Sequence, residues 1–286
     1  MKWQDLRKSS NVEDRRGRSV GRGAAVGGLG IGGVVLVIIF ALVTGMNPAE
    51  VLNTVQQQSA PPPSGSESSA PIDDADSQFV RGILGDTEDV WTNVFKTQLN
   101  NQDYPEPTLV LFSGAVNSAC GSANSAMGPF YCPSDAKVYL DMAFFSEIKA
   151  TAGPNSEFAR AYAIAHEVGH HIQNVLGIMD KVNAQRQSAD QATANDLSVR
   201  IELQADCFAG VWGHFTVQRG IVDQQDVTAA MNTASQIGDD YLQKQAQRRV
   251  VPDSFTHGSS EQRVSWFTKG LKTGDINQCN TFAGAI

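Results

Sequence analysis

His166-Glu167-Val168-Gly169-His170 is the stretch of this 286-residue chain that decides its fold. It has the form H-E-x-x-H, and on an α-helix its two histidines lie on one face because they are four residues apart. Two imidazole nitrogens placed in this way can bind one Zn²⁺ ion at about 2.0–2.1 Å and leave a coordination position open. Glu167 would lie beside a water molecule at that position and act as its general base. The stretch therefore predicts a catalytic zinc helix.

The sequence around the motif predicts a long, partly buried helix over residues 157–177. Apolar residues recur there at three- and four-residue steps, as expected for one buried helix face: Phe158, Ala161, Ala165, Val168, Ile172 and Leu176. Gly169 costs about 1 kcal/mol relative to alanine in a helix interior, so we expect another backbone to pack closely against it. A helix with solvated histidines, His171 included, is the alternative interpretation.

The third zinc ligand is expected on a second helix, over residues 194–219. Metzincins place a third histidine six residues after the motif, but that position is Leu176 here. Glu202 and Asp206 are four residues apart and share one helix face. We predict that Glu202 is the third ligand and that Asp206 accepts the free N–H of a ligating histidine. Asp206 itself and His214 are alternative third ligands, and a solvated acidic face is the alternative to both roles.

Several stretches of the chain carry a family resemblance. Residues 166–171 (HEVGHH) and 202–210 (ELQADCFAG) resemble the bacterial neutral zinc metallopeptidase family, which is of the gluzincin type. Further blocks resemble other parts of that family, so that the resemblance covers nearly the whole chain except a linker: residues 11–17, 128–133, 138–141 and 256–263. The resemblance implies a zincin-like domain that uses Zn²⁺ to hydrolyse peptides or proteins.

Residues 24–46 are almost wholly apolar and uncharged, and they are long enough to span a bilayer about 30 Å thick. Residues 1–23 contain seven basic and three acidic residues, a net charge of +4. The positive-inside rule then predicts a single crossing of the cytoplasmic membrane, with the N-terminus cytoplasmic and the catalytic domain periplasmic or extracellular. A cleaved signal peptide is the alternative. The spacings Gly23/Gly27 and Gly28/Gly32 would allow two such helices to form a homodimer.

The chain is therefore predicted to have four segments. A basic cytoplasmic leader (1–23) and a transmembrane anchor (24–46) are followed by a linker (47–77), whose Gln, Pro and Ser runs cannot bury a core. A metallopeptidase-like domain follows over residues 78–286. Because residues 1–23 carry +4 of a total of −8, the rest of the chain carries −12, which argues against nucleic acid as a partner.

Four cysteines fit an oxidising compartment and allow three pairings. We favour Cys120–Cys132, which closes a short loop rich in Gly and Ser. This choice leaves Cys207–Cys279 to connect the C-terminal tail to the helix of Glu202. A zinc site made only of sulfur ligands is the alternative, but the chain has no C-x-x-C pair.

The remaining patterns predict an α+β fold that is mainly helical with a small sheet. Helices are expected over 79–99, from an N-cap at Asp223 to near residue 249, and after a capping box formed by Ser259 and Gln262. Strands are expected over 108–113 and 137–140. An edge strand near residues 125–131 would bind extended substrate above the metal helix, unless that stretch is only a disulfide-closed surface loop.

His257, just before the last helix, is the candidate for stabilising the oxyanion formed during hydrolysis. A structural hydrogen bond is its alternative role, and Arg263 and Tyr241 are weaker candidates. The sequence thus predicts a membrane-anchored zinc endopeptidase with a peptide or protein substrate: Zn²⁺ on His166, His170 and Glu202, with Glu167 and His257 catalytic. A tethered envelope binding or assembly factor with a structural zinc, or a zinc amidase acting on cell-wall peptides, are the alternatives.

Overall fold

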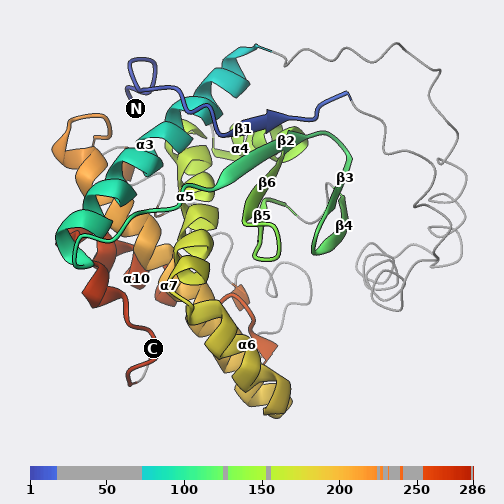
Figure 1. Cartoon of the computed structure of the whole chain (residues 1–286), viewed down its shortest axis with the longest axis vertical. Coiled ribbons are helices and arrows are strands. Elements are labelled where there is room, and N and C mark those ends of the chain that lie inside the picture. Colours follow the sequence, from blue (N-terminus) through green and yellow to red (C-terminus); the bar gives the residue numbers. More distant parts are fainter. Residues whose placement is uncertain are drawn as a thin grey trace, which may run out of the picture.

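The computed structural model describes residues 1–17, 73–124, 128–152, 156–223, 226–227, 231, 239–240, 254–284 and 286. These residues form a mixed, mainly helical protein with two small sheets (Figure 1). No helix within them has the length and apolar character needed to cross a membrane. The predicted anchor (24–46), its glycine pairs and most of the predicted linker lie outside the described residues. The bilayer and homodimer partners therefore stay predictions.

Four short strands form the main sheet, in the order β1-β2-β6-β5. They are β1 (Val12–Asp14), β2 (Thr108–Phe112), β6 (Lys137–Asp141) and β5 (Phe130–Cys132). β1 and β6 run parallel to β2, whereas β5 is antiparallel to β6. A separate antiparallel hairpin joins β3 (Ala115–Ser118) to β4 (Gly121–Asn124). The strands predicted over 108–113 and 137–140 are confirmed to within one residue, and β5 overlaps the end of the edge strand predicted near 125–131. Strands β1, β3 and β4 were not predicted.

The helices place the zinc motif at the centre of the molecule. The metal helix α5 (Ser156–Val175) packs against α3 (Ala75–Gln98), against α7 (Gln191–Gln218) and against the sheet (Figure 1). α4 (Met142–Ala152) and α6 (Ile178–Ser188) flank it, and α10 (Ser260–Thr273) lies along α7, followed by the short 3₁₀ helix η4 (Ile276–Cys279). The predicted capping box of Ser259 and Gln262 is confirmed. The helix predicted after Asp223 falls mainly outside the described residues.

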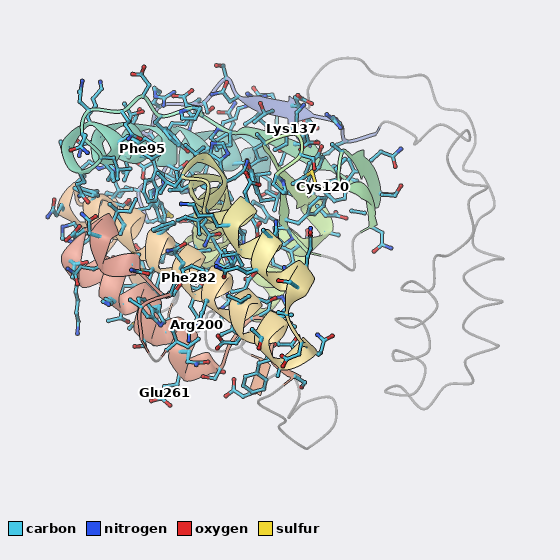
Figure 2. All side chains as sticks on the ribbon, turned by 60° about the horizontal axis from the view of Figure 1, so that its bottom comes forward. Phe95, Cys120, Lys137, Arg200, Glu261 and Phe282 are labelled. Carbon is cyan, nitrogen blue, oxygen red and sulfur yellow. A yellow bond between two sulfur atoms is a disulfide. The ribbon has the colours of Figure 1, made fainter. Side chains whose placement is uncertain are left out.

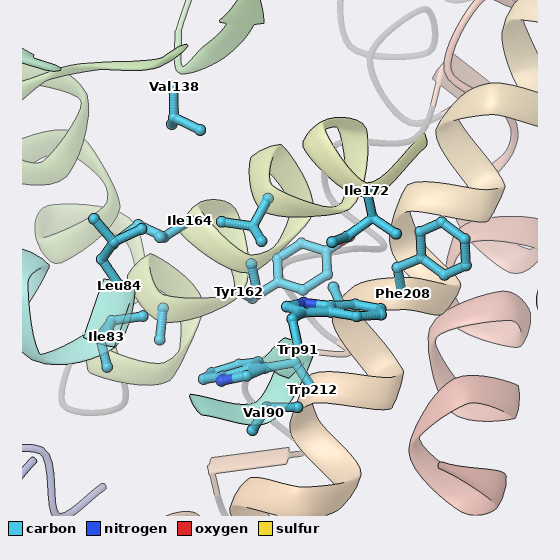
Figure 3. Close-up of a cluster of buried hydrophobic side chains, with 14 of the residues drawn as sticks. Ile83, Leu84, Val90, Trp91, Val138, Tyr162, Ile164, Ile172, Phe208 and Trp212 are labelled. Carbon is cyan, nitrogen blue, oxygen red and sulfur yellow. The ribbon is translucent and has the colours of Figure 1, made fainter. Parts of the chain in front are cut away.

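The hydrophobic core fills the space between α3, α5 and α7 (Figure 3). Trp91, Tyr162 and Trp212 are among its largest side chains, and each is at most 1% exposed. Full burial of one large apolar side chain contributes about 1.5–3 kcal/mol. The Trp212 indole also donates a 2.8 Å hydrogen bond to Asp86 of α3. These contacts fix the three helices relative to one another, and therefore the side chains that α5 and α7 present to each other.

Residues 1–17 are not a separate leader, so the predicted boundary between residues 1–23 and the domain does not hold for them. Val12 pairs with Leu109 in the sheet, and the preceding residues run along α3 (Figure 1). The physical reason is that this basic segment also carries apolar side chains. Val12 is buried in the core, and the Trp3 ring lies 5.3 Å from that of Phe79.

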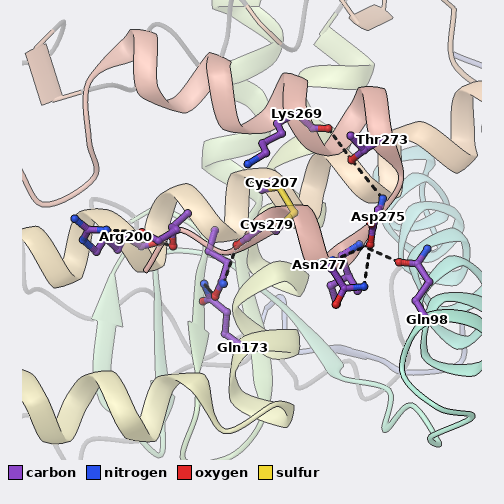
Figure 4. Close-up of a disulfide and its surroundings, with 12 residues drawn as sticks. Gln98, Gln173, Arg200, Cys207, Lys269, Thr273, Asp275, Asn277 and Cys279 are labelled. Carbon is purple, nitrogen blue, oxygen red and sulfur yellow. Dashed lines mark hydrogen bonds between the residues drawn. A yellow bond between two sulfur atoms is a disulfide. The ribbon is translucent and has the colours of Figure 1, made fainter. Parts of the chain in front are cut away.

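The predicted disulfide pairing is confirmed. Cys120–Cys132 ties the turn of the β3–β4 hairpin to β5, and Figure 2 marks Cys120 there. Cys207–Cys279 joins α7 to η4 (Figure 4). Because these bridges use all four cysteines, the alternative of a sulfur-only zinc site is wrong.

Candidate metal centre

The predicted ligands come together where α5 crosses α7. His166 Nε2 lies 3.2 Å from Glu202 Oε2, and His170 Nε2 lies 3.5 Å from Glu202 Oε1. The histidine side chains are 9% and 10% exposed and Glu202 is 20% exposed, so the cluster is largely buried. Among the described residues these three are the group that could hold a metal ion.

A close approach between the two helices sets these distances. A Cβ atom on Gly169 would lie 2.9 Å from the carbonyl oxygen of Ala205 and 3.1 Å from its Cα atom. Real Cβ atoms do not come this close, so only glycine permits the crossing. The neighbouring backbone expected at Gly169 is therefore present, and it belongs to the helix that carries Glu202.

The geometry of the cluster fits zinc. One donor atom from each residue lies within 4.8 Å of the others. Ligand atoms bound tetrahedrally at about 2.0–2.1 Å from an ion lie about 3.3–3.4 Å apart, and the Nε2 atom of each histidine lies near this distance from a different oxygen of Glu202. Two imidazoles and one carboxylate are also the donor set of a catalytic zinc site that keeps its fourth position open.

A buried network orients His166. Its Nδ1 lies 2.8 Å from Asp206 Oδ1, as predicted, which leaves Nε2 to face the metal position. Arg263 of α10 donates to both Asp206 oxygens, at 2.8 and 2.9 Å, and the Tyr162 hydroxyl donates to Asp206 as well. Asp206 therefore contacts His166 and Arg263, and it is not part of the three-residue group that could hold a metal ion. Two guanidinium nitrogens of Arg263 bind it, which argues against the oxyanion role considered for Arg263.

His170 is oriented by residues that the sequence analysis did not assign. Its Nδ1 lies 2.8 Å from Gln173 Oε1, and the Gln173 amide donates to Ile201 O and to Gln204 Oε1. Gln204 then donates to Cys279 O, beside the second disulfide (Figure 4). Gln173 lies three residues after His170, on the same helix face, and this spacing is the signal that could have found it.

The charged side chains of the site change one another's pKa values. Burial lowers the pKa of His166, but the Asp206 and Glu202 carboxylates outweigh burial and raise it to about 10. Burial opposes ionisation of Glu202, yet the charges of His170 and His166 hold its pKa well below the usual range. Burial raises the pKa of Glu167, which makes this carboxylate a stronger base than an exposed glutamate.

His171 is a buried structural residue, which contradicts the alternative of solvated histidines. It is 2% exposed, its Nε2 lies 2.6 Å from Pro105 O, and its Nδ1 lies 3.1 Å from the Tyr131 hydroxyl. Burial lowers its pKa. Asn174, one residue before the last of α5, also donates to Tyr131, so α5 is attached to strand β5. The part of the predicted substrate stretch at residues 125–127 is outside the described residues.

His257 has the surroundings of an oriented, accessible imidazole. Its side chain is 52% exposed, and its Nδ1 lies 3.2 Å from Asp239 Oδ1. The other Asp239 oxygen accepts the backbone N–H groups of Thr256, His257 and Gly258. The hydrogen bond to Asp239 raises the pKa of His257, and the charge of Glu202 adds to this effect.

Of the remaining candidates, His214 lies at the other end of the contact between α7 and α10. There its Nδ1 is 2.8 Å from Leu271 O, and the metal group does not include it. Tyr241 is outside the described residues.

Comparison with known proteins agrees with this centre. Residues 1–282 match the family described as "Putative neutral zinc metallopeptidase". The "Uncharacterized protein YpfJ" of Escherichia coli (strain K12) is 46% identical over the full length of both chains. An uncharacterized protein of Mycobacterium tuberculosis (strain H37Rv) is 42% identical over 64% of each chain. No solved structure matches.

The two histidines and one glutamate define a candidate zinc centre of the kind found in metallohydrolases. The chain belongs to the neutral zinc metallopeptidase family, and its cofactor is Zn²⁺.

Proposed function

We propose that this protein is a zinc-dependent endopeptidase with a zincin-like catalytic domain. The observation that carries the proposal is a group of three ligands among the described residues together with the buried carboxylate of Glu167, which follows His166 directly in the chain. A structural zinc usually has four protein ligands and needs no neighbouring base. This difference favours hydrolysis over a binding or assembly role.

The proposed roles follow from the positions of the residues. His166, His170 and Glu202 would hold the zinc ion, which when bound acidifies water and polarises a carbonyl group. Glu167 would accept a proton from the attacking water at its carboxylate and later donate it to the leaving amine. Its raised pKa suits both steps, because a carboxylate that is too acidic would not hold the proton.

His257 is proposed to stabilise the oxyanion. Its contact with Asp239 holds Nδ1, so that Nε2 remains available for a hydrogen bond. The raised pKa of His257 favours the protonated form, which is the form that donates to a developing negative charge.

Strand β5 is proposed as the site for the substrate backbone. Within the described sheet it is the antiparallel edge strand, and Tyr131 links it directly to α5. An extended peptide could add to this edge through main-chain hydrogen bonds, which give affinity without a strict sequence preference.

We propose that the domain works in an oxidising compartment outside the cytoplasm. Two disulfides support this, because such bonds persist in the periplasm or at the cell exterior and are rare in the cytosol. The lipid bilayer is the proposed second partner, through the apolar residues 24–46.

The test is cleavage of a peptide library by the zinc-loaded full-length chain, since residues 1–17 belong to the fold. Glu167→Gln should keep one equivalent of zinc and lose turnover, whereas the control Glu261→Gln, at an exposed position, should keep both. The library also contains cross-linked cell-wall peptides, whose cleavage would support the alternative of a zinc amidase. No cleavage by wild type with zinc bound would contradict the proposal, and so would full activity in Glu167→Gln.

A further inference from the structure

The N-terminal strap, defined here as residues 1–17, packs closely against the glycine residues Gly82 and Gly85 of helix α3. A Cβ atom on Gly82 would lie 2.9 Å from Lys8 Nζ and 3.3 Å from Trp3 O. A Cβ atom on Gly85 would collide with the carbonyl oxygen of Arg7. Each glycine costs a helix interior about 1 kcal/mol relative to alanine. The pair is explained by the backbone of the strap, which could not otherwise lie so close to α3.

The strap also satisfies a buried charge. Glu88 of α3 is completely buried. It accepts hydrogen bonds from Ser9 at 2.6 Å and from Asn11 at 2.9 Å, and it forms a 2.8 Å ion pair with Arg7. All three partners belong to the strap. A buried carboxylate deprived of such partners is costly, so α3 in its present form requires the strap.

The sheet gives the third observation. Asn11 O accepts the backbone N–H of Leu109, and Arg15 donates its own N–H to Leu111 O, both at 2.8 Å. Strand β1 therefore covers one edge of β2 and buries Val12. Because β1 pairs with β2 in the main sheet, β1 and the rest of the domain must lie in the same cellular compartment.

Two arginines of the strap form ion pairs with carboxylates of the folded domain. Arg7 pairs with Glu88 and Asp89. Arg16 is 8% exposed and pairs with Asp14 and with Asp74, which caps α3. These arginines contributed to the charge that predicted a cytoplasmic leader. Carboxylates pair with these arginines in the folded protein. The positive charge of the arginines is therefore weak evidence that the N-terminus lies on the cytoplasmic side of a membrane.

We infer that residues 1–17 and the domain that begins at residue 73 lie on the same side of the membrane. This replaces the orientation predicted from the positive-inside rule, in which the two parts lie on opposite sides. It does not depend on peptidase activity.

The test uses the full-length chain in the membranes of a Gram-negative host. Gln4→Cys in the strap and Asn93→Cys on α3 are each exposed, and the native cysteines are all in disulfides, so a maleimide reports only the new thiols. A membrane-impermeant maleimide is applied to intact spheroplasts and to inside-out vesicles. Labelling of both positions in the same preparation is expected. Labelling of the two positions in opposite preparations would overturn the inference.

A second measurement asks whether the strap is docked in the membrane-associated protein. Ser9 is 2% exposed, so the thiol of Ser9→Cys should react at least tenfold more slowly than that of Gln4→Cys in the native chain. Adding Gly85→Leu should displace the strap and remove this protection. Adding Lys96→Leu, an exposed change on the same helix, should not. Equal reactivity of the two thiols in the otherwise native chain would show an undocked strap and refute the inference.

Discussion

Replacing Asp206 with asparagine should separate the orientation of His166 from its ability to bind metal. The variant keeps the shape of the side chain but removes its charge and puts an amide N–H₂ group in place of one oxygen. That group must face either His166 Nδ1 or the Arg263 guanidinium, which lie 2.8 and 2.8–2.9 Å from the present oxygens. Loss of such a partner weakens metal binding about 10- to 100-fold, equivalent to about 1.4–2.8 kcal/mol.

The same change should also lower the stability of the metal-free protein. Arg263 is 3% exposed, and the change removes the carboxylate charge of Asp206 that pairs with its buried guanidinium. Breaking a buried ion pair in this way costs about 3–5 kcal/mol. Adding Arg263→Met to Asp206→Asn should therefore recover much of the stability but not the zinc affinity.

Zinc affinity is measured by competition with a chelating dye, and stability by urea unfolding of the metal-free protein. Asp196→Asn is the matched control, because Asp196 lies on the same helix but is 50% exposed in its pair with Arg200. A surface pair of this kind contributes about 0–1 kcal/mol. If Asp206→Asn binds zinc as tightly as the Asp196 control, the assigned role of Asp206 is refuted.

Three further predictions address other parts of the structure. His257→Ala should retain zinc and lower kcat about 100-fold, and unchanged turnover would remove His257 from the mechanism. Gly169→Ala should lower the free energy of unfolding by about 1–3 kcal/mol, because its Cβ atom would overlap the facing helix; urea unfolding measures this. Zinc affinity should fall about tenfold for each pH unit below the His166 pKa of about 10, because the proton competes with the metal for that imidazole. Titration calorimetry in buffers of different ionisation enthalpy should then detect about one proton released per zinc at neutral pH, and no release would contradict the competition.

The zinc helix could be predicted because its chemistry is local. His166 and His170 share a helix face through backbone geometry alone, and the same spacing identified Glu202 and Asp206. The roles of Gln173 and Arg263 were harder to predict from the sequence. An amide three residues after a histidine has many ordinary uses on a helix. Arg263 reaches Asp206 only through the tertiary contact between α7 and α10.

Strand β1 was missed for a related reason. It has three residues, two of which are acidic, so it offers no alternation of apolar and polar side chains. Its partner β2 begins almost 100 residues later. The surrounding basic residues were interpreted through the apolar run that follows them, although Arg7 and Arg16 form ion pairs with carboxylates of the fold. Composition alone cannot distinguish a charge that is paired in a folded domain from one that faces lipid headgroups.

Close backbone contacts between three helices fix the positions of the predicted zinc ligands, and these contacts do not involve the metal. Gly169 admits α7 against α5, and Gly210 of α7 and Gly270 of α10 allow those two helices to approach closely in the same way. The chain of contacts from His166 through Asp206 to Arg263 crosses all three helices. The Asp206 and Glu202 carboxylates raise the pKa of His166 to about 10 against the opposing effect of burial. Because these contacts between the helices do not involve the metal, the fold is expected to persist without zinc, unlike that of a structural zinc domain.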